Sequence, residues 1–269
     1  MGLKEIADAV LHLIDAGEYQ VNGNTVRFDR EQLEALKGTR LYTPRQIASL
    51  KDLKGCPPEI QITDGTTQLV ANEITSNVGG PVGLLNFASA RNPGGGFLNG
   101  AKAQEEDLCR CSGLYPCLLQ CMTYYEENRR QASLLYTDNA IFTPNVPFFK
   151  VNGTGELLHK PFFVSVITAP APNSGPFLKL NPDATEELRC TFVRRWRNVL
   201  RIARDQGISR LLLGAWGCGA FGGNPVMASQ TAKEAIQGSG GGFDKIVFAI
   251  PTSGRQSITN FKAFRATFT

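Results

Sequence analysis

Short, nearly continuous apolar runs bounded by Gly, Pro or Asn are the feature that most restricts how this chain can fold. Helical segments lie between several of these runs, and the clearest, over residues 183–206, has apolar side chains on one face and ends at Gly207. Strands without a polar face need cover on both sides, so we predict an α/β protein with its sheet between helices. The predicted strands are 60–62, 82–88, 140–143, 162–167, 211–215 and 246–250.

The first fifty residues have a different pattern, which predicts polar helices. Apolar residues recur at helical spacing from Ile6 to Ile14, a second, charged helix is predicted from Phe28, and a third from Pro44. The chain has no internal repeat and no long linker. We therefore expect an N-terminal helical extension over residues 1–55, packed on a single core over residues 56–269.

Composition excludes several classes of protein. A chain of 269 residues with 42% hydrophobic content can bury a sizeable core. The longest apolar runs are far shorter than the roughly 20 residues of a membrane span. Residues 1–16 mix charged with apolar side chains and lack the apolar core of a secretory signal, so we expect a cytoplasmic protein. The formal charge of +4 is too small to predict sequence-specific nucleic-acid binding, although it tolerates a polyanionic ligand.

Cysteine spacing raises the question of a metal site. The odd number of cysteines, seven, argues against a disulfide framework and favours reduced thiols. Cys109, Cys111, Cys117 and Cys121 cluster with spacings that resemble those of metal ligands. The segment is helical in character and has no supporting His, so packed thiols are the favoured interpretation. We expect neither a metal nor a cofactor.

A stretch of three glycines lies close to two adjacent carboxylates. Gly94-Gly95-Gly96 is separated by seven residues from Gln104-Glu105-Glu106. Consecutive glycines allow positive φ angles and let backbone N–H groups approach an anion. A carboxylate beside such a turn can lose solvent, which raises its pKa and suits it to general acid catalysis. The alternative is a surface loop before an acidic helix start, since Glu is favoured there for dipole reasons alone.

A second glycine-rich turn, over residues 214–225, follows another predicted strand. Pro225 suits the first position of a helix and Asn224 can cap it, so the helix start offers donors to an anion. The turn lacks the Gly-Lys-Ser/Thr of a Walker A motif and the spacing of a Rossmann turn, which argues against nucleotide hydrolysis. Its glycines could instead serve tight strand–helix packing. Both turns follow strands, so they could flank one cleft.

The stretch 94–106 resembles the triple-glycine and Gln-Glu-Glu signature of poly(ADP-ribose) glycohydrolases. Its flanks, over 86–93 and 108–115, resemble the microbial, short-chain branch of that family, and the turn 214–225 is similar to the second phosphate loop of that branch. The resemblance runs from about residue 60 to the C-terminus. It implies a macrodomain, a mixed sheet sandwiched between helices, in agreement with the α/β class predicted above.

The resemblance also implies roles for single residues. Glu106 matches the catalytic acid, which would protonate the departing ribose oxygen and then activate the attacking water. Glu105 matches a neighbour that binds ribose hydroxyls. Adjacent helical residues diverge by about 100°, so separate roles are expected for the two glutamates. The residues matched to substrate binding are Gly94, Gly95, Gly96, Gln104, Asn92, Ser89, Gly217, Cys218, Gly219, Ala220, Phe221, Asp64 and Phe261.

Within this set, the two glycine turns would hold the ribose and diphosphate from opposite sides, and both would supply N–H donors. Phe221 matches an aromatic side chain that packs on the ribose under attack. Ser89 and Asn92 are candidate ribose contacts, and Asp64 is a candidate for the adenine amino group. Phe261 could stack on adenine, although an apolar, core-facing position in a C-terminal helix is the commoner case for such a residue.

The implied function is hydrolysis of ribose–ribose bonds in poly(ADP-ribose), with ADP-ribosylated proteins as carriers of the polymer, a monomeric enzyme and a role in the DNA damage response. Two alternatives stay open: a macrodomain that only binds ADP-ribose, and an enzyme that removes single ADP-ribose units from protein or nucleic acid. A reader has no need for acidic residues such as Glu105 and Glu106 at the reacting carbon. Whether cleavage occurs within the polymer depends on how the cleft is closed, and residues 257–269 are the expected wall.

Overall fold

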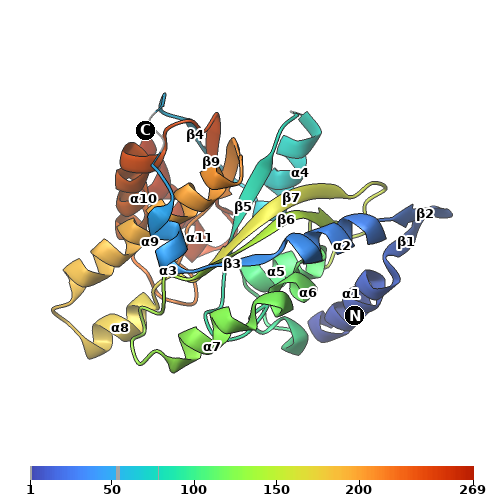
Figure 1. The fold of residues 1–269 in the computed structure, drawn as a ribbon, viewed down its shortest axis with the longest axis horizontal. Coiled ribbons are helices and arrows are strands. Elements are labelled where there is room, and N and C mark those ends of the chain that lie inside the picture. Colours follow the sequence, from blue (N-terminus) through green and yellow to red (C-terminus); the bar gives the residue numbers. More distant parts are fainter. Residues whose placement is uncertain (1, 53–54, 78) are drawn as a thin grey trace.

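The structure is a computed structural model that describes residues 2–52, 55–77 and 79–269. Its main feature is a seven-stranded mixed sheet with the strand order β3-β6-β7-β5-β8-β9-β4 (Figure 1). Strands β7, β5, β8, β9 and β4 run parallel, whereas β6 and β3 are antiparallel to their neighbours. All six predicted runs lie in this sheet. The strands are β3 (Arg40–Tyr42), β4 (Glu59–Thr63), β5 (Val82–Phe87), β6 (Ala140–Phe148), β7 (Phe162–Ala169), β8 (Arg210–Leu213) and β9 (Lys245–Ala249).

Helices cover both faces of the sheet, which confirms the predicted layers. Strand side chains alternate between two hydrophobic clusters: Leu211 and Leu213 pack in one, and Leu212 packs in the other. The first cluster is covered by α3 (Pro44–Ser49), α8 (Ser174–Leu180), α9 (Thr185–Asp205), α10 (Pro225–Ser239) and α11 (Arg255–Phe268). The second is covered by α1 (Leu3–Ala16), α4 (Thr67–Asn77), α5 (Gln104–Cys111), α6 (Leu114–Leu118), the 3-10 turns η1 (Phe97–Asn99) and η2 (Leu119–Cys121), and α7 (Met122–Arg130).

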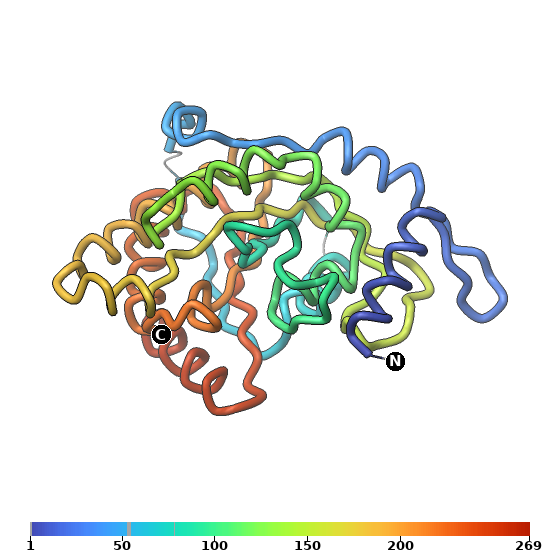
Figure 2. Tube along the Cα trace, turned by 90° about the horizontal axis from the view of Figure 1, so that it is seen from below, coloured from blue at the N-terminus to red at the C-terminus, as the bar shows by residue number. Residues whose placement is uncertain are grey.

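The N-terminal segment contains the three predicted helices, α1, α2 (Asp29–Gly38) and α3, and three strands, β1 to β3, that the sequence analysis missed. A hairpin joins β1 (Glu18–Val21) to β2 (Asn24–Arg27) through Asn22 and Gly23, both with positive φ. Strand β3 pairs with β6 and forms one edge of the sheet. Figure 2 shows this blue segment running along one side of the molecule, and through β3 the segment is part of the sheet.

Five parallel strands end at the same edge of the sheet, and this arrangement places the candidate site. The segments that follow β4, β5, β7, β8 and β9 all leave the sheet at that edge. They include both glycine-rich turns that the sequence singled out. Within the described ranges, no helix combines the length and apolar character needed to cross a membrane.

Candidate active site

A cavity of about 1020 Å³ lies at the carboxyl edge of the parallel strands. Every parallel strand contributes to it, through its last residues or the segment that follows. Ligands of open α/β sheets bind at this edge. The cavity is therefore where the predicted site residues should meet. Its walls include Thr66, Thr67, Phe87, Gln104, Ala171, Trp216, Gly217, Gly219, Ala220, Phe221, Ile250, Ser257 and Asn260.

The triple-glycine turn folds against α5. Gly94 and Gly95 have φ angles of 65° and 60°, a region that favours glycine. A Cβ on Gly95 would collide with the Glu106 carboxylate and would lie 3.1 Å from Glu105 Oε2. Both carboxylates thus converge on the backbone of Gly95, even though their side chains diverge along the helix. The glycines allow the chain to approach two acids closely.

Two amides of this turn are already used inside the protein. The amide of Gly95 donates to the carbonyl of Asn92 at 3.0 Å, and the amide of Gly96 donates to Glu106 Oε1 at 2.9 Å. The sequence-based expectation that the turn supplies N–H donors to a ligand therefore does not hold for these two groups in this structure. Gly96 fixes a carboxylate instead.

Glu105 is the more enclosed of the two acids. Its Oε1 accepts a hydrogen bond from Asn86 Nδ2 at 3.1 Å, and its Oε2 accepts from the amide of Ser89 at 2.7 Å. Burial raises the pKa of Glu105 to about 8, and the nearby charge of Glu106 adds to the effect, although both hydrogen bonds oppose it. The raised pKa expected for a carboxylate beside the glycine turn is found at this residue.

Glu106 leaves one oxygen without a partner. The residue is 8% exposed, against 2% for Glu105. Its Oε1 is held by Gly96, whereas its Oε2 is buried and has no hydrogen-bond partner among the described residues. Among the described residues that line the cavity, Gln104 and Asp107 on either side of the two glutamates are present, whereas Glu105, Glu106 and the triple-glycine turn are not. Buried polar atoms are nearly always paired, so the unpaired Glu106 oxygen indicates a partner that arrives with a ligand.

Gln104 fixes the start of α5 to the sheet. Its Oε1 accepts from the amide of Phe87 at 2.8 Å, and its Nε2 donates to the Leu85 carbonyl at 2.9 Å and to Thr67 Oγ1 at 3.2 Å. These contacts tie strand β5, helix α4 and helix α5 together. Gln104 lines the cavity as predicted, but its amide group is occupied by the protein itself.

The second glycine turn keeps free donors. Gly217 and Gly222 have positive φ angles of 79° and 64°, and the amide of Gly223 closes the turn on the Gly217 carbonyl at 2.9 Å. Asn224 caps α10 by accepting from the amides of Val226 and Met227, as predicted. Within residues 217–223, all of which the structure describes, four amides donate no hydrogen bond within the protein: those of Gly217, Gly219, Ala220 and Phe221. This loop has the donors that an anion needs.

Side chains of the second turn point in different directions. Phe221 lines the cavity, together with Gly217, Gly219 and Ala220. Cys218 is 2% exposed and belongs to the core cluster, where its thiol lies 3.6 Å from the Trp216 carbonyl. Burial raises the pKa of Cys218 to about 12. The prediction that Cys218 contacts substrate can therefore apply only to its backbone.

The two candidate ribose contacts, Ser89 and Asn92, have structural roles in and before the glycine turn. Ser89 Oγ accepts hydrogen bonds from the amides of Arg91 and Asn92, at 3.2 and 3.1 Å. The amide of Ser89 holds Glu105, and the carbonyl of Asn92 holds Gly95. Both residues shape the approach to the glutamates, and the Asn92 side chain is exposed at the surface.

Neither of the two adenine candidates, Asp64 and Phe261, is among the described residues that line the cavity. Asp64 accepts from the amide and the hydroxyl of Thr252, at 2.8 and 2.6 Å, and so fixes the segment after β9. Phe261 is half-buried and packs against the core cluster, which was the alternative considered for it. Among the described residues that line the cavity, α11 is represented by Ser257 and Asn260 and not by Phe261. The expected wall over 257–269 thus contributes its first turns.

Asn86 and Thr168 are site residues that the sequence analysis missed. Both are fully buried, on neighbouring strands, and Asn86 Nδ2 donates to Glu105 Oε1 and to Thr168 Oγ1. The available signal was an Asn inside the apolar run 82–88, since a polar residue in a buried strand needs partners.

The cysteine cluster is part of the hydrophobic core. Cys109, Cys111, Cys117 and Cys121 are buried, and all seven cysteines are free thiols. Burial raises the pKa of each of these four thiols, which makes them poor metal ligands and poor nucleophiles. In the described part of the chain, no three His, Cys, Asp or Glu side chains are grouped so that they could hold a metal ion.

Solved structures of poly(ADP-ribose) glycohydrolases are similar to this chain over almost its whole length. Poly(ADP-ribose) glycohydrolase from Thermomonospora curvata is 37% identical, with a TM-score of 0.90 over 99% of each chain. The same enzyme bound to the inhibitor ADP-HPD gives 37% identity and a TM-score of 0.89, again over 99% of each chain. The Deinococcus radiodurans enzyme in complex with ADP-ribose is 37% identical, with a TM-score of 0.81 over 93% of this chain and 98% of its own.

Sequence comparison agrees. The family model described as the microbial-type PARG catalytic domain, where PARG stands for poly(ADP-ribose) glycohydrolase, matches residues 7–151. That span is more than half of the 269 residues and includes the triple-glycine turn and both glutamates. No curated protein sequence matches the chain. On these matches in sequence and fold, the chain belongs to the microbial-type poly(ADP-ribose) glycohydrolase family.

Proposed function

We propose that this chain hydrolyses the ribose–ribose O-glycosidic bonds of poly(ADP-ribose) and releases ADP-ribose. Its family supports this reaction class. The single observation that carries the proposal in this chain is the Glu106 carboxyl group. One of its oxygens is fixed by Gly96, and the other is buried and has no partner among the residues that the structure describes. Such a group is oriented and ready to exchange a proton with a substrate oxygen.

Glu106 acts as the general acid and base. It protonates the ribose oxygen that departs as the bond to the anomeric carbon breaks, and the carboxylate then takes a proton from the water that attacks this carbon. Burial raises the pKa of Glu105 to about 8, so Glu105 holds a proton near neutral pH and places no negative charge beside Glu106.

Glu105 orients the site. Both of its oxygens are engaged, by Asn86 and by Ser89, so its position is fixed before substrate arrives. A carboxyl group held in this way can direct ribose hydroxyls and keep Glu106 in place at low entropic cost.

The second glycine turn binds the diphosphate. The free amides of Gly217, Gly219, Ala220 and Phe221 point to this role, and α10 begins directly after the turn with its N-terminal dipole end. A diphosphate beside the reacting ribose stabilises the oxocarbenium-like centre through its negative charge. The site therefore needs no second catalytic carboxylate on the opposite face of the sugar, in contrast to most glycosidases.

The test is release of ADP-ribose from purified poly(ADP-ribose) by the wild type and by Glu106→Gln, with ADP-ribose binding measured by calorimetry on both. We expect Glu106→Gln to bind ADP-ribose within about threefold of wild type and to lose roughly 10³-fold or more in rate, as for loss of a group that acts in the transition state. The exposed Glu73→Gln, on α4, is the matched control and should keep full activity.

Other outcomes identify the alternatives. Binding of ADP-ribose without cleavage of polymer or of a mono-ADP-ribosylated protein would make the chain a reader. Cleavage of the mono-modified protein alone would make it a mono-ADP-ribosyl hydrolase. Activity that falls on addition of EDTA would contradict the proposed chemistry, which uses no metal and no cofactor.

We further propose that the polymer is carried by ADP-ribosylated proteins and that the chain acts as a cytoplasmic monomer in the DNA damage response. In the same proposal, residues 1–55 form an extension on the catalytic core of residues 56–269. The packing of α1 in the same cluster as α5 supports this arrangement, as does the hydrogen bond from the Tyr19 hydroxyl to the Leu158 carbonyl at 2.8 Å.

A further inference from the structure

Phe221 has an aromatic neighbour that lies outside the cavity lining. The ring of Tyr136, from the loop between α7 and β6, lies with its centroid 6.1 Å from that of Phe221, at 47°. Tyr136 is half-buried, and its hydroxyl accepts a hydrogen bond from Asn173 Nδ2 at 3.5 Å. In the described part of the chain Phe221 lines the cavity and Tyr136 does not. Tyr136 therefore reaches the site through Phe221.

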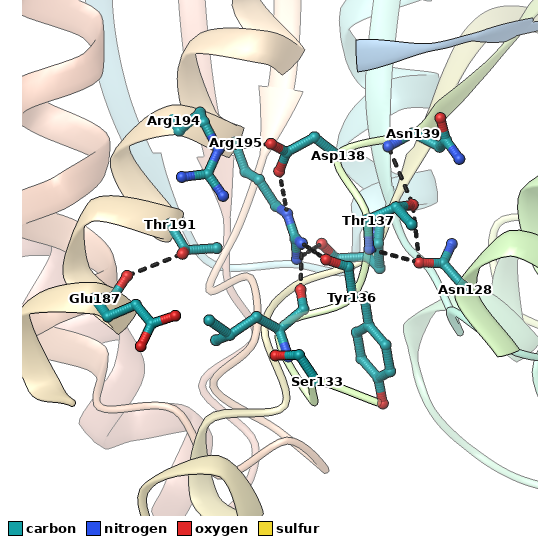
Figure 3. Close-up of polar contacts among 12 residues, drawn as sticks. Asn128, Ser133, Tyr136, Thr137, Asp138, Asn139, Glu187, Thr191, Arg194 and Arg195 are labelled. Atoms are coloured by element: carbon teal, nitrogen blue, oxygen red, sulfur yellow. Dashed lines mark hydrogen bonds and ion pairs between the residues drawn. The ribbon is translucent and has the colours of Figure 1, made fainter. Parts of the chain in front are cut away.

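Tyr136 is held in an unusual backbone conformation. Its φ angle is 61°, in the left-handed region that bulky side chains rarely adopt. The turn is closed by the amide of Tyr136, which donates to the Ser133 carbonyl at 3.2 Å. The following residue, Thr137, is fixed by the fully buried Asn128 of α7, whose Oδ1 accepts from the Thr137 amide and hydroxyl at 2.8 and 2.9 Å (Figure 3). Strained positions of this kind persist only where the surroundings enforce them.

Arg195 of α9 makes several of the contacts that hold the Tyr136 backbone in this conformation. It is 2% exposed, and its guanidinium points into the loop, as Figure 3 shows. Its Nη2 donates to the carbonyls of Leu135 and, at 3.1 Å, of Tyr136, and its Nη1 donates to the Pro170 carbonyl at 2.9 Å. Asp138 neutralises the charge at 3.0 Å from Nε. One buried cation thus joins the Tyr136 loop to the end of β7, next to the cavity residue Ala171.

The adjacent Arg194 provides an internal comparison. Its Nε lies 2.6 Å from the other oxygen of Asp138, but its side chain is 51% exposed. Arg194 therefore shares the carboxylate with Arg195. The hydrogen bonds to the carbonyls of Leu135, Tyr136 and Pro170 are made by Arg195.

We propose that Tyr136 is a positioning residue that fixes the Phe221 ring in the cavity wall, and that Arg195 holds Tyr136 in place. This inference rests on the proposed function and on the role that the family resemblance implies for Phe221, whose ring would pack on the ribose under attack. Phe221 also packs against the core cluster, and Tyr136 is its aromatic neighbour at the cavity wall, so without the Tyr136 ring Phe221 loses a contact and gains rotational freedom. Because misplacement of a reacting group by about 1 Å can cost about 10²-fold in rate, the effect falls on turnover more than on binding.

The experiment compares Tyr136→Leu with Tyr136→Phe, two variants that face the same backbone strain. We expect Tyr136→Leu to lower kcat for ADP-ribose release about tenfold or more while KM changes less than threefold. Tyr136→Phe should restore wild-type kcat, because the ring contact is kept and only one long hydrogen bond is lost. Arg195→Gln should resemble Tyr136→Leu, and Arg194→Gln should resemble wild type.

A second readout does not depend on activity. With 4-fluorophenylalanine incorporated, the ¹⁹F resonance of Phe221 can be assigned by its loss in Phe221→Leu. We expect this resonance to shift or broaden in Tyr136→Leu and to return in Tyr136→Phe, in the absence of any ligand. If Arg195→Gln does not fold, the Tyr136 pair carries the test alone.

The two proposals fail in different ways. A wild-type chain that releases no ADP-ribose overturns the proposed function, and the ¹⁹F spectra still decide whether Tyr136 sets Phe221. If the wild-type chain releases ADP-ribose and Tyr136→Leu does so with the same kcat, the positioning role is overturned. An unchanged Phe221 resonance in that variant overturns it as well.

Discussion

The two glycine-rich turns of the site follow neighbouring strands, yet they use their backbones in opposite ways. The turn at 94–96 directs the amides of Gly95 and Gly96 to acceptors within the protein, one of them Glu106. The turn at 217–223 leaves four amides free and buries the side chain of Cys218. Glycine in the first turn permits close approach to two acids, whereas in the second it exposes donors. Similar composition therefore does not imply a similar role.

The largest effect is expected where the first turn meets the acids. In Gly95→Ala, the new methyl group collides with the Glu106 carboxylate and the residue stays at a φ of 60°. We expect ADP-ribose release to fall about 10²-fold or more, since the acid is displaced. Steady-state assays on purified polymer measure this.

Gly207→Ala is the control for Gly95→Ala. Gly207 has a φ of 69° and nothing within 4 Å of an added Cβ, so this variant introduces the strain without the collision. It should lose about 1 kcal/mol of unfolding free energy and keep its rate. If Gly95→Ala and Gly207→Ala released ADP-ribose at equal rates, the collision with Glu106 would have no effect, and the role given to the first turn would be wrong.

A smaller effect is expected inside the second turn, where two glycines differ in their surroundings. A Cβ on Gly217, at a φ of 79°, would lie 3.0 Å from Ala171 Cβ and 3.1 Å from the Phe192 ring, whereas a Cβ on Gly219 meets nothing within 4 Å. We expect Gly217→Ala to weaken ADP-ribose binding about tenfold, as for loss of one or two bonds to a charged group. Gly219→Ala should stay within about twofold. Calorimetry that finds wild-type affinity for Gly217→Ala as well would contradict the loop as the anion site.

A separate effect, on stability and not on activity, concerns pH. The pKa of Glu105 is about 8 in the folded chain, above the ordinary value of 4.5, so the native state binds the extra proton between these values. The free energy of unfolding should therefore decrease as pH rises through this window, by at most about 1.4 kcal/mol per pH unit from this group. Urea titrations from pH 5 to pH 8 should show a flatter dependence for Glu105→Gln. If the unfolding free energies of wild type and Glu105→Gln changed with pH in the same way, the raised pKa of Glu105 in the folded chain would be contradicted.

Much of the fold could be predicted from local pattern. The six apolar runs, the helix of residues 183–206 and the cap at Asn224 depend on neighbours along the chain, and the structure has them all. The family resemblance, based on the two glycine turns, is confirmed by the family model and by the matched structures. Strand β3 was missed because three residues carry no periodicity, and the β1–β2 hairpin was missed although Asn22-Gly23 signals such a turn.

The sequence by itself determined the α/β class and the position of the two glycine turns at strand ends, and it proposed Glu105 and Glu106 as candidate acids. Tertiary structure decided which polar atoms are free. Asp64 meets Thr252 across 188 residues, and Asn86 meets Glu105 from a different element. The reason is that strand and helix patterns depend on residues close in sequence. Hydrogen-bond satisfaction and burial depend on whichever segments the sheet brings together.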